Sequence, residues 1–165
     1  VNKKDKRIAR MTALQVLYAC EFSGSEPGDI LAHLSENDVI KDEELRLFIT
    51  DEDGNDDYSL TPNIIAYGGK IARIAISNKE FLNELIVNRS QNWEFERISV
   101  MDRLILQMAI SEMLFIDEVP PKVSIAEAVE IAKVFSSSES SRFVNGILDT
   151  TYNDSQQGKI ELPNK

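Results

Sequence analysis

The sequence predicts an all-α protein. Apolar residues recur at spacings of three and four instead of alternating, which is the pattern of amphipathic helices. No run of β-branched residues is bounded by turn-forming residues in the way that a strand would be. With 165 residues, of which 42% are hydrophobic and 28% charged, the chain can bury a core as one domain or as two packed halves.

The expected helices of the first part are separated by turns and by acidic residues. A helix over residues 3–22 is expected to end at a Gly/Pro turn, and Asp29 is expected to cap a helix that begins at Ile30. A short helix over residues 42–49 follows. Residues 51–59, DEDGNDDYS, combine acids with turn formers, so they predict an exposed acidic loop.

Proline and a capping pattern place the next two helices. Pro62 suits the first position of a helix, and Ser77 with Glu80 forms a capping-box pattern for a helix over residues 78–89. The sequence therefore predicts that one helix begins at Pro62 and that a second follows it after a short break.

The last third of the chain predicts three helices. A serine three residues before an acid opens the apolar stretch over residues 100–116, whose apolar residues nearly encircle it, so this helix is expected in the core. Ser124 opens another capping-box pattern, for a helix over residues 125–135, and a serine-rich run precedes a helix over residues 140–152. The polar end, residues 156–165, is expected to be disordered.

Positive charge is concentrated at the start of the chain. The formal net charge is −10, yet the first ten residues contain one acid and five cations, which are Lys3, Lys4, Lys6, Arg7 and Arg10. The remaining residues contain 13 basic and 27 acidic side chains, a net charge of −14. Anion binding must therefore use this local patch, because the field of the rest repels an anion.

The first expected helix sorts these cations onto one side. At about 100° per residue, four of them share one outward arc: Lys3, Lys6, Arg7 and Arg10. The opposite side is apolar: Ala9, Ala13, Val16 and Cys20. Tyr18 follows Arg7 by eleven residues, close to three turns, so its ring is expected at the edge of the cationic arc.

A basic stripe bordered by an aromatic suits a nucleic-acid strand. Cations neutralise phosphates and release counterions, and a ring offers a stacking surface to an unpaired base. The alternative is a solvated basic terminus with a half-buried tyrosine behind it. The stripe alone does not decide between these two interpretations.

Catalytic chemistry and a membrane location find little support. His33 and Cys20 are the only histidine and cysteine, which gives no zinc constellation and no nucleophile motif around His33. Gly68 and Gly69 lack the spacing of a phosphate loop, so they indicate close helix contact. No apolar run approaches the ~20 residues that a membrane-spanning helix needs. We expect a cytoplasmic protein without enzymatic activity, metal or cofactor.

Four ordered motifs resemble the NusB family of transcription antitermination factors. They are RIARMTALQVLY near the start, then NWEFERISVMDRLILQMAISEML, VPPKVSIAEAVEIAKVF and RFVNGILD. The resemblance implies a compact bundle of about seven helices in two packed helical subdomains, over residues 1–58 and 60–153 of one domain that ends near residue 155. It implies no catalysis.

The resemblance also implies partners. Members of the family bind the boxA element of ribosomal RNA leader transcripts, as single-stranded RNA, in a heterodimer with the ribosomal protein NusE that serves the transcription elongation complex. Self-association into a homodimer through the same surface stays open. A strongly acidic body attracts a basic ribosomal protein through its long-range field, which fits this partnership.

Carried over by motif, the resemblance assigns RNA-binding roles to two groups of residues. The first is the basic segment with its aromatic: Lys3, Lys6, Arg7, Arg10 and Tyr18. The second comes from the later motifs: Asp102, Glu139 and Phe143. An aromatic such as Phe143 can stack on a base, although a core phenylalanine is the alternative, and carboxylates can accept hydrogen bonds from base amines or cap a helix. Asn145 and Gly146 are assigned to structure, as a buried amide and a close-packing glycine.

The chain departs from the family pattern at Gln107 and Ala126, where family members usually carry arginine and asparagine. The first change removes a cation near the centre, and the second removes a hydrogen-bonding group near the expected cap of its helix. A second hypothesis follows, in which the chain is a helical protein-interaction scaffold that keeps the fold but has lost RNA binding.

Overall fold

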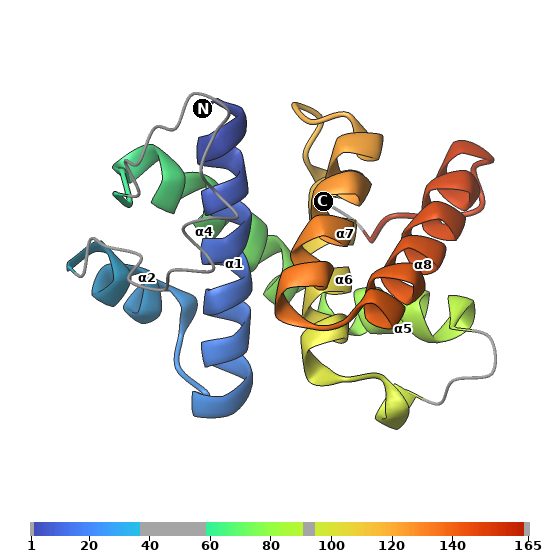
Figure 1. Cartoon of the computed structure of the whole chain (residues 1–165), viewed down its shortest axis with the longest axis horizontal. Helices are drawn as coiled ribbons and strands as arrows, with labels where there is room; N and C mark the ends of the chain where they lie inside the picture. Colours follow the sequence, from blue (N-terminus) through green and yellow to red (C-terminus); the bar gives the residue numbers. More distant parts are fainter. Residues whose placement is uncertain (1, 37–58, 91–94, 164–165) are drawn as a thin grey trace. The chain divides into compact units, whose positions relative to one another are not determined.

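The computed structural model describes residues 2–36, 59–90 and 95–163. Within these ranges the regular elements are seven α-helices and one 3₁₀ turn: α1 (Lys3–Ser23), α2 (Pro27–Glu36), α4 (Pro62–Ser77), α5 (Lys79–Arg89), η1 (Phe95–Arg97), α6 (Val100–Phe115), α7 (Pro121–Phe135) and α8 (Ser138–Gln156) (Figure 1). The all-α prediction is confirmed. The helix expected over residues 42–49 and the acidic stretch of residues 51–57 lie outside the described residues.

The chain divides into two compact units, Val1–Arg73 and Ile74–Lys165. The boundary between these units lies inside α4, whose glycines at positions 68 and 69 pack against α1 and α2; the family-type division near residue 59 stays a prediction.

In the first unit, α1 has defined caps at both ends. The side chain of Asn2 accepts a hydrogen bond from the backbone N–H of Asp5 over 2.8 Å, which satisfies one of the free donors of the first turn. Gly24 adopts the left-handed conformation (φ 67°) and its N–H donates to the Cys20 carbonyl. Glycine tolerates this conformation without steric cost, so it ends the helix close to the predicted residue 22.

The two adjacent glycines of α4 allow close packing in the first unit. A Cβ on Gly68 would lie 2.6 Å from the Ala9 carbonyl oxygen of α1, and one on Gly69 would lie 2.9 Å from a Leu31 methyl of α2. A side chain at position 68 would meet backbone that cannot move aside, whereas one at position 69 would require the Leu31 side chain to shift. The predicted role of both glycines in helix contact is confirmed.

The start of α2 differs from the prediction. The helix begins at Pro27, three residues before Ile30. Proline is pre-organised for the first helical turn and has no N–H that needs a partner there. Asp29 consequently lies inside the first turn, where its charge favours the positive end of the helix dipole, and it does not cap the helix.

In the second unit, α6 is the central helix. It contacts α5, α7 and α8, and twelve of its sixteen residues are buried, as its nearly encircling apolar pattern predicts. The side chain of Ser99 caps it by accepting a hydrogen bond from the Asp102 N–H over 3.1 Å. Both the core position and the cap are confirmed.

Of the three other helix starts in this unit, that of α7 lies four residues before the predicted one, whereas those of α5 and α8 lie within two residues of the prediction. α7 begins at Pro121, so Ser124 lies buried within the helix and caps nothing. α5 follows Asn78, whose side chain makes no cap bond and instead donates to the Ile74 carbonyl behind it, so the Ser77 capping box does not form. α8 begins at Ser138 with Ser137 as its cap. A competing proline thus takes the first position of α7, whereas the cap of α8 is one of the serines in the run that predicts it.

The chain beyond α8 turns back instead of fraying. Gly158 has φ 70°, and the Lys159 N–H donates to the Asp154 carbonyl over 2.9 Å. The structure describes the backbone through residue 163. These turn bonds satisfy the last carbonyls of the helix, and the disorder expected of residues 156–165 stays a prediction.

Candidate nucleic-acid interface

The N-terminal end of α1 carries a group of accessible cations. Lys3 is exposed, and Lys6 and Arg7 are half-buried. Positive side chains are electrostatically disfavoured at the positive end of a helix dipole. Asp5 is the acidic residue of the first turn, and an anion bound here would add to its stabilisation of the helix end.

Arg10 does not share the exposure of these cations. Its side chain is only 2% exposed, and every residue from 8 to 14 is buried. The prediction of one outward cationic arc requires that the same face of α1 is exposed to solvent along its whole length. In this middle stretch the helix is enclosed on all sides, so the prediction of an exposed Arg10 is wrong.

Tyr18 is exposed and belongs to an aromatic pair. It is 47% exposed, and its ring centroid lies 4.7 Å from that of Phe22, which is 62% exposed. The sequence interpretation missed Phe22, although its i, i+4 spacing from Tyr18 was a usable signal. At 1.5 Å per residue, Tyr18 lies roughly 16 Å along the axis from Arg7. The cations and the aromatic pair are therefore separate contact points, with the buried stretch between them.

In the second unit, the three later candidate residues line one cavity. Asp102, Glu139 and Phe143 surround a hollow of about 230 Å³ together with Arg97, Ser99 and Ser140. Asp102 comes from the first turn of α6, whereas Glu139 and Phe143 come from the first half of α8. The fold thus gathers residues that are about forty positions apart in the sequence.

Hydrogen bonds fix the wall of this cavity. The Ser140 hydroxyl donates to Asp102 Oδ2 over 2.9 Å, and the Ser136 hydroxyl donates to Ser140 Oγ over 2.8 Å. Asp102 is 7% exposed, and its other oxygen, Oδ1, has no hydrogen-bond donor among the residues that the structure describes. The carboxylate is therefore held in place with acceptor capacity left over.

The lining of this cavity combines the groups that recognise an unpaired base. Phe143 is half-buried, Glu139 is exposed and Arg97 is exposed. An aromatic ring can stack on a base, a carboxylate can accept from an exocyclic amine, and a guanidinium can pair with a phosphate. The sequence analysis did not assign a role to Arg97, which is the last residue of η1. No local pattern marked it.

The two departures from the family pattern have different structural settings. Gln107 is 2% exposed in α6, and its amide donates to Asn83 Oδ1 of α5 over 2.6 Å. This residue joins two helices. Ala126 is exposed in the second turn of α7 and lies away from the start of that helix.

Asn145 and Gly146 do not have the packing roles expected from the sequence. Both are exposed. The Asn145 amide lies 3.4 Å from Asp149 Oδ2, one turn along α8, and a Cβ on Gly146 would meet nothing within 4 Å. The assignment to a buried amide and a close-packing glycine is wrong, because Asn145 is exposed and the space beside Gly146 is open.

The described part of the chain offers neither a metal site nor a membrane span. It contains no group of three or more His, Cys, Asp or Glu side chains placed to hold a metal ion. None of its helices is both long enough and apolar enough to cross a bilayer.

Comparison with known sequences identifies one family along most of the chain. The NusB family pattern matches residues 7–153. A relative named transcription antitermination protein NusB, from Chloroherpeton thalassium, is 36% identical over 97% of this chain and 71% of its own length. Another protein of the same name, from Symbiobacterium thermophilum, is 35% identical over 87% of this chain.

Solved structures show the same fold. T. maritima NusB superposes with a TM-score of 0.69 at 26% identity, covering 94% of this chain and 97% of that one. The structure of antitermination factors NusB and NusE in complex with double-stranded RNA contains a chain with a TM-score of 0.70 at 21% identity, covering 92% of this chain and 98% of that one. With ordered motifs, helical fold and sequence similarity in agreement, the chain belongs to the NusB family of transcription antitermination proteins.

Proposed function

We propose that this chain binds a boxA-type single-stranded RNA as a heterodimer with a NusE-type ribosomal protein, and that the pair acts on the transcription elongation complex. The observation that carries the proposal is the cavity shared by Asp102, Glu139 and Phe143, because it combines acceptors with an aromatic ring. A solved structure with this fold is a complex of NusB and NusE with double-stranded RNA, which supports NusE and RNA as partners; the single-stranded form of the RNA is part of the proposal.

The two ends of α1 have different tasks in this proposal. Lys3, Lys6 and Arg7 contact phosphates at the N-terminal end, where the helix dipole adds to their attraction for anions. Tyr18, together with Phe22, provides a stacking surface near the other end. Arg10 is a buried positioning residue that holds this stretch of α1 in place.

The cavity lined by Asp102, Glu139 and Phe143 binds one unpaired base. Phe143 stacks against it, and Asp102 with Glu139 accepts hydrogen bonds from its amines. Ser140 holds Oδ2 of Asp102 and Oδ1 is buried, so the exposed Glu139 meets the base first and Asp102 accepts from it only after a small local opening. This arrangement favours cytosine or adenine, whose exocyclic amines are donors, over uracil.

The partner supplies positive charge that the body of this chain lacks. At a net charge of −10, the chain attracts a basic ribosomal protein and raises its association rate. The complex then presents the RNA with a less repulsive surface. A homodimer would bring a second acidic body and would not serve this purpose.

Fluorescence anisotropy with a labelled boxA-type RNA, with and without the NusE-type protein, tests this function. The double variant Lys6→Ala/Arg7→Ala should bind more weakly, and the slope of log K against log salt should fall by about 1.4, at about 0.7 per lost phosphate contact for a single strand. The control Lys122→Ala/Lys133→Ala removes the same charge from exposed positions of α7 and should match the wild type. Equal binding by both double variants would reject the site on α1.

The same titration separates the proposal from the scaffold hypothesis. The burial of Arg10 leaves fewer accessible cations than the sequence suggested, which favours weak RNA binding by the chain alone. A heterodimer that binds the RNA more tightly than the NusE-type protein alone supports the antitermination function. A heterodimer that forms without any gain in RNA affinity supports the scaffold.

A further inference from the structure

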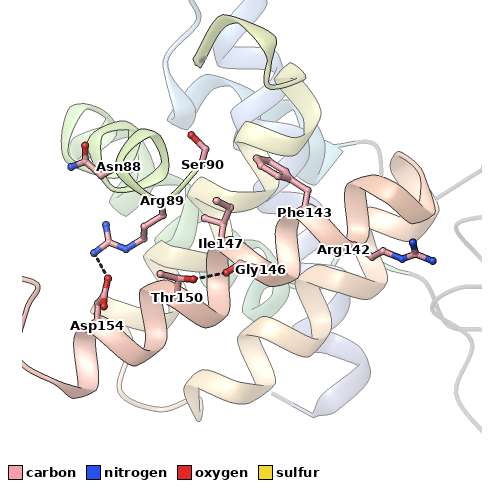
Figure 2. Close-up of a pocket in the computed structure, with 9 residues that line it drawn as sticks. All are labelled: Asn88, Arg89, Ser90, Arg142, Phe143, Gly146, Ile147, Thr150 and Asp154. Carbon is pink, nitrogen blue, oxygen red and sulfur yellow. Dashed lines mark hydrogen bonds and ion pairs between the residues drawn. The ribbon is translucent and has the colours of Figure 1, made fainter. Parts of the chain in front are cut away.

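A larger groove opens in the second unit between the C-terminal end of α5 and the middle of α8. It has a volume of about 600 Å³, within the range of small-molecule sites. Asn88 and Arg89 line it from α5, and Phe143, Gly146 and Thr150 line it from α8 (Figure 2). Of the residues that line this groove, only Phe143 has a role in the proposed RNA binding.

The floor of the groove is the bare backbone at Gly146. No atom lies within 4 Å of the position that a Cβ would occupy there, and the backbone is ordinary helix, so neither packing nor conformation requires glycine. The Thr150 hydroxyl donates to the Gly146 carbonyl over 2.9 Å (Figure 2). The missing side chain thus keeps the groove open, and it allows a flat group to approach the helix backbone.

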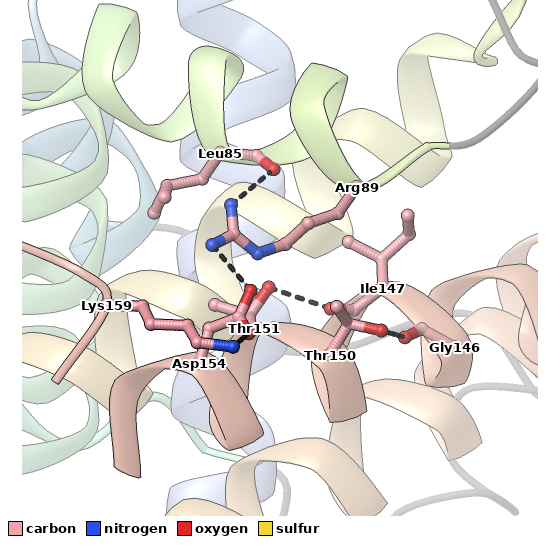
Figure 3. A network of polar contacts seen from close by, with 8 residues as sticks. All are labelled: Leu85, Arg89, Gly146, Ile147, Thr150, Thr151, Asp154 and Lys159. Carbon is pink, nitrogen blue, oxygen red and sulfur yellow. Dashed lines mark hydrogen bonds and ion pairs between the residues drawn. The ribbon is translucent and has the colours of Figure 1, made fainter. Parts of the chain in front are cut away.

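The charged residues of the groove leave an excess of positive charge. Arg89 donates to Asp154 Oδ2 over 2.9 Å and to the Leu85 carbonyl over 3.2 Å, and Lys159 lies 4.0 Å from Asp154 on the other side (Figure 3). Asp154 is therefore already neutralised. Arg142 lies at the rim, exposed, with its guanidinium pointing away from the other labelled residues (Figure 2).

Phe143 connects this groove to the cavity of Asp102 and Glu139, because it lines both. A strand that stacks a base against Phe143 has its neighbouring nucleotide at the edge of the groove. A guanidinium at the rim suits a phosphate, and the open floor between Asn88 and Thr150 suits a base. A basic protein segment, such as a ribosomal protein offers, would gain nothing from the cationic rim.

We propose that the groove between α5 and α8 is a subsite for one further nucleotide of the bound RNA, with its phosphate at Arg142 and its base over Gly146. This inference rests on the proposed function and extends the RNA path past Phe143. The subsite accepts a nucleotide of any sequence through its phosphate, and Asn88 adds hydrogen bonds to a base edge.

Filling the groove without touching its charges tests the subsite. The variant Gly146→Leu places a side chain over the floor, and Gly146→Ala is its matched control, because a single methyl leaves most of the space open. Each variant and the wild type are titrated, as heterodimers with the NusE-type protein, with a core boxA-type RNA and with the same RNA extended by two nucleotides at its 5′ or its 3′ end. Thermal melts check that each variant is folded.

The expected result is that one extension improves binding by the wild type and by Gly146→Ala about fivefold to tenfold, whereas Gly146→Leu binds the core and extended RNAs equally. Arg142→Ala should reduce the same gain and leave binding of the core RNA within twofold.

Four results would overturn the inference. If neither extension improves wild-type binding, or if Gly146→Leu keeps the full gain, the groove binds no nucleotide although the core function stands. If Gly146→Leu weakens the association with the NusE-type protein and leaves RNA affinity unchanged, the groove belongs to a protein contact. If no RNA binds to the wild-type heterodimer, the proposed function fails and the subsite fails with it.

Discussion

The hydroxyl of Ser140 donates a hydrogen bond to Asp102 Oδ2 over 2.9 Å, and this bond joins the first turn of α8 to the first turn of α6. It holds the carboxylate at the wall of the cavity that Glu139 and Phe143 also line. A single side chain therefore links the stability of a helix junction to the geometry of the candidate base site.

Replacing Ser140 by alanine tests that link. The loss of a partly buried hydrogen bond to a charged group should lower the free energy of unfolding by about 1.5 to 3 kcal/mol, and RNA affinity should fall because Asp102 is no longer held. Guanidinium unfolding and anisotropy titration measure the two effects. The control is Ser138→Ala, at an exposed position in the same turn, which should change neither quantity. An unchanged RNA affinity for Ser140→Ala would show that RNA binding does not depend on the hydrogen bond from Ser140 to Asp102.

Two glycine substitutions should change stability in opposite directions. Gly68→Ala forces a methyl to within 2.6 Å of the Ala9 carbonyl oxygen, and relieving this overlap should cost about 1 to 3 kcal/mol. Gly146→Ala meets open space and restricts only the unfolded chain, so it should stabilise by about 0.4 to 1 kcal/mol. Thermal melts of both variants check the pair. A stabilising Gly68→Ala would contradict the close contact of α1 and α4.

Substitutions of Arg10 and Lys6 should affect different properties, the first the stability of the fold and the second RNA binding. Arg10→Ala removes a fully buried side chain and should destabilise by about 1 to 3 kcal/mol, whereas Lys6→Ala should change stability by less than about 0.5 kcal/mol and weaken RNA binding. Denaturant unfolding is compared with RNA titration for each variant. If Arg10→Ala keeps wild-type stability and loses RNA binding, Arg10 reaches the RNA directly and its assignment as a positioning residue is wrong.

Cys20 should react slowly with thiol reagents. Burial raises the pKa of its thiol above the ordinary value, and the negative charge of Glu26 raises it further. The reactive thiolate is consequently scarcer at pH 8 than in a free cysteine, and the rate should rise as pH increases towards and beyond the ordinary pKa. Ellman's reagent, with glutathione as reference, measures the rate. Glu26→Gln should speed the reaction at pH 8; a rate equal to that of glutathione would contradict the raised pKa.

Which segments are helical could be predicted from the sequence, because the spacing of apolar residues indicates helices directly. The core position of α6 and the close approach at Gly68 both followed from local pattern. Helix starts were less predictable, since several residues that can begin a helix stand close together. At α7, Pro121 and the Ser124 pattern competed, and proline took the position because its fixed φ suits the first turn.

The candidate site was predictable only where exposure follows from local sequence. Tyr18 is exposed as expected, but Arg10 is buried. Helical periodicity predicts on which side of the helix a side chain lies, but it does not predict which other parts of the chain pack against that side. The convergence of Asp102 with Phe143 depends on tertiary packing of α6 against α8. No local pattern contains that information, and family resemblance supplied it.

The affinity of Phe143→Leu for a boxA-type RNA, measured in the heterodimer with the NusE-type protein, tests the central claim most directly. Leucine keeps an apolar side chain in the cavity and removes the stacking surface, so affinity should fall by about tenfold, in line with the 1 to 3 kcal/mol of one stacked base. Affinity within twofold of the wild type, for a variant with a wild-type melting temperature, would show that this cavity does not read the RNA.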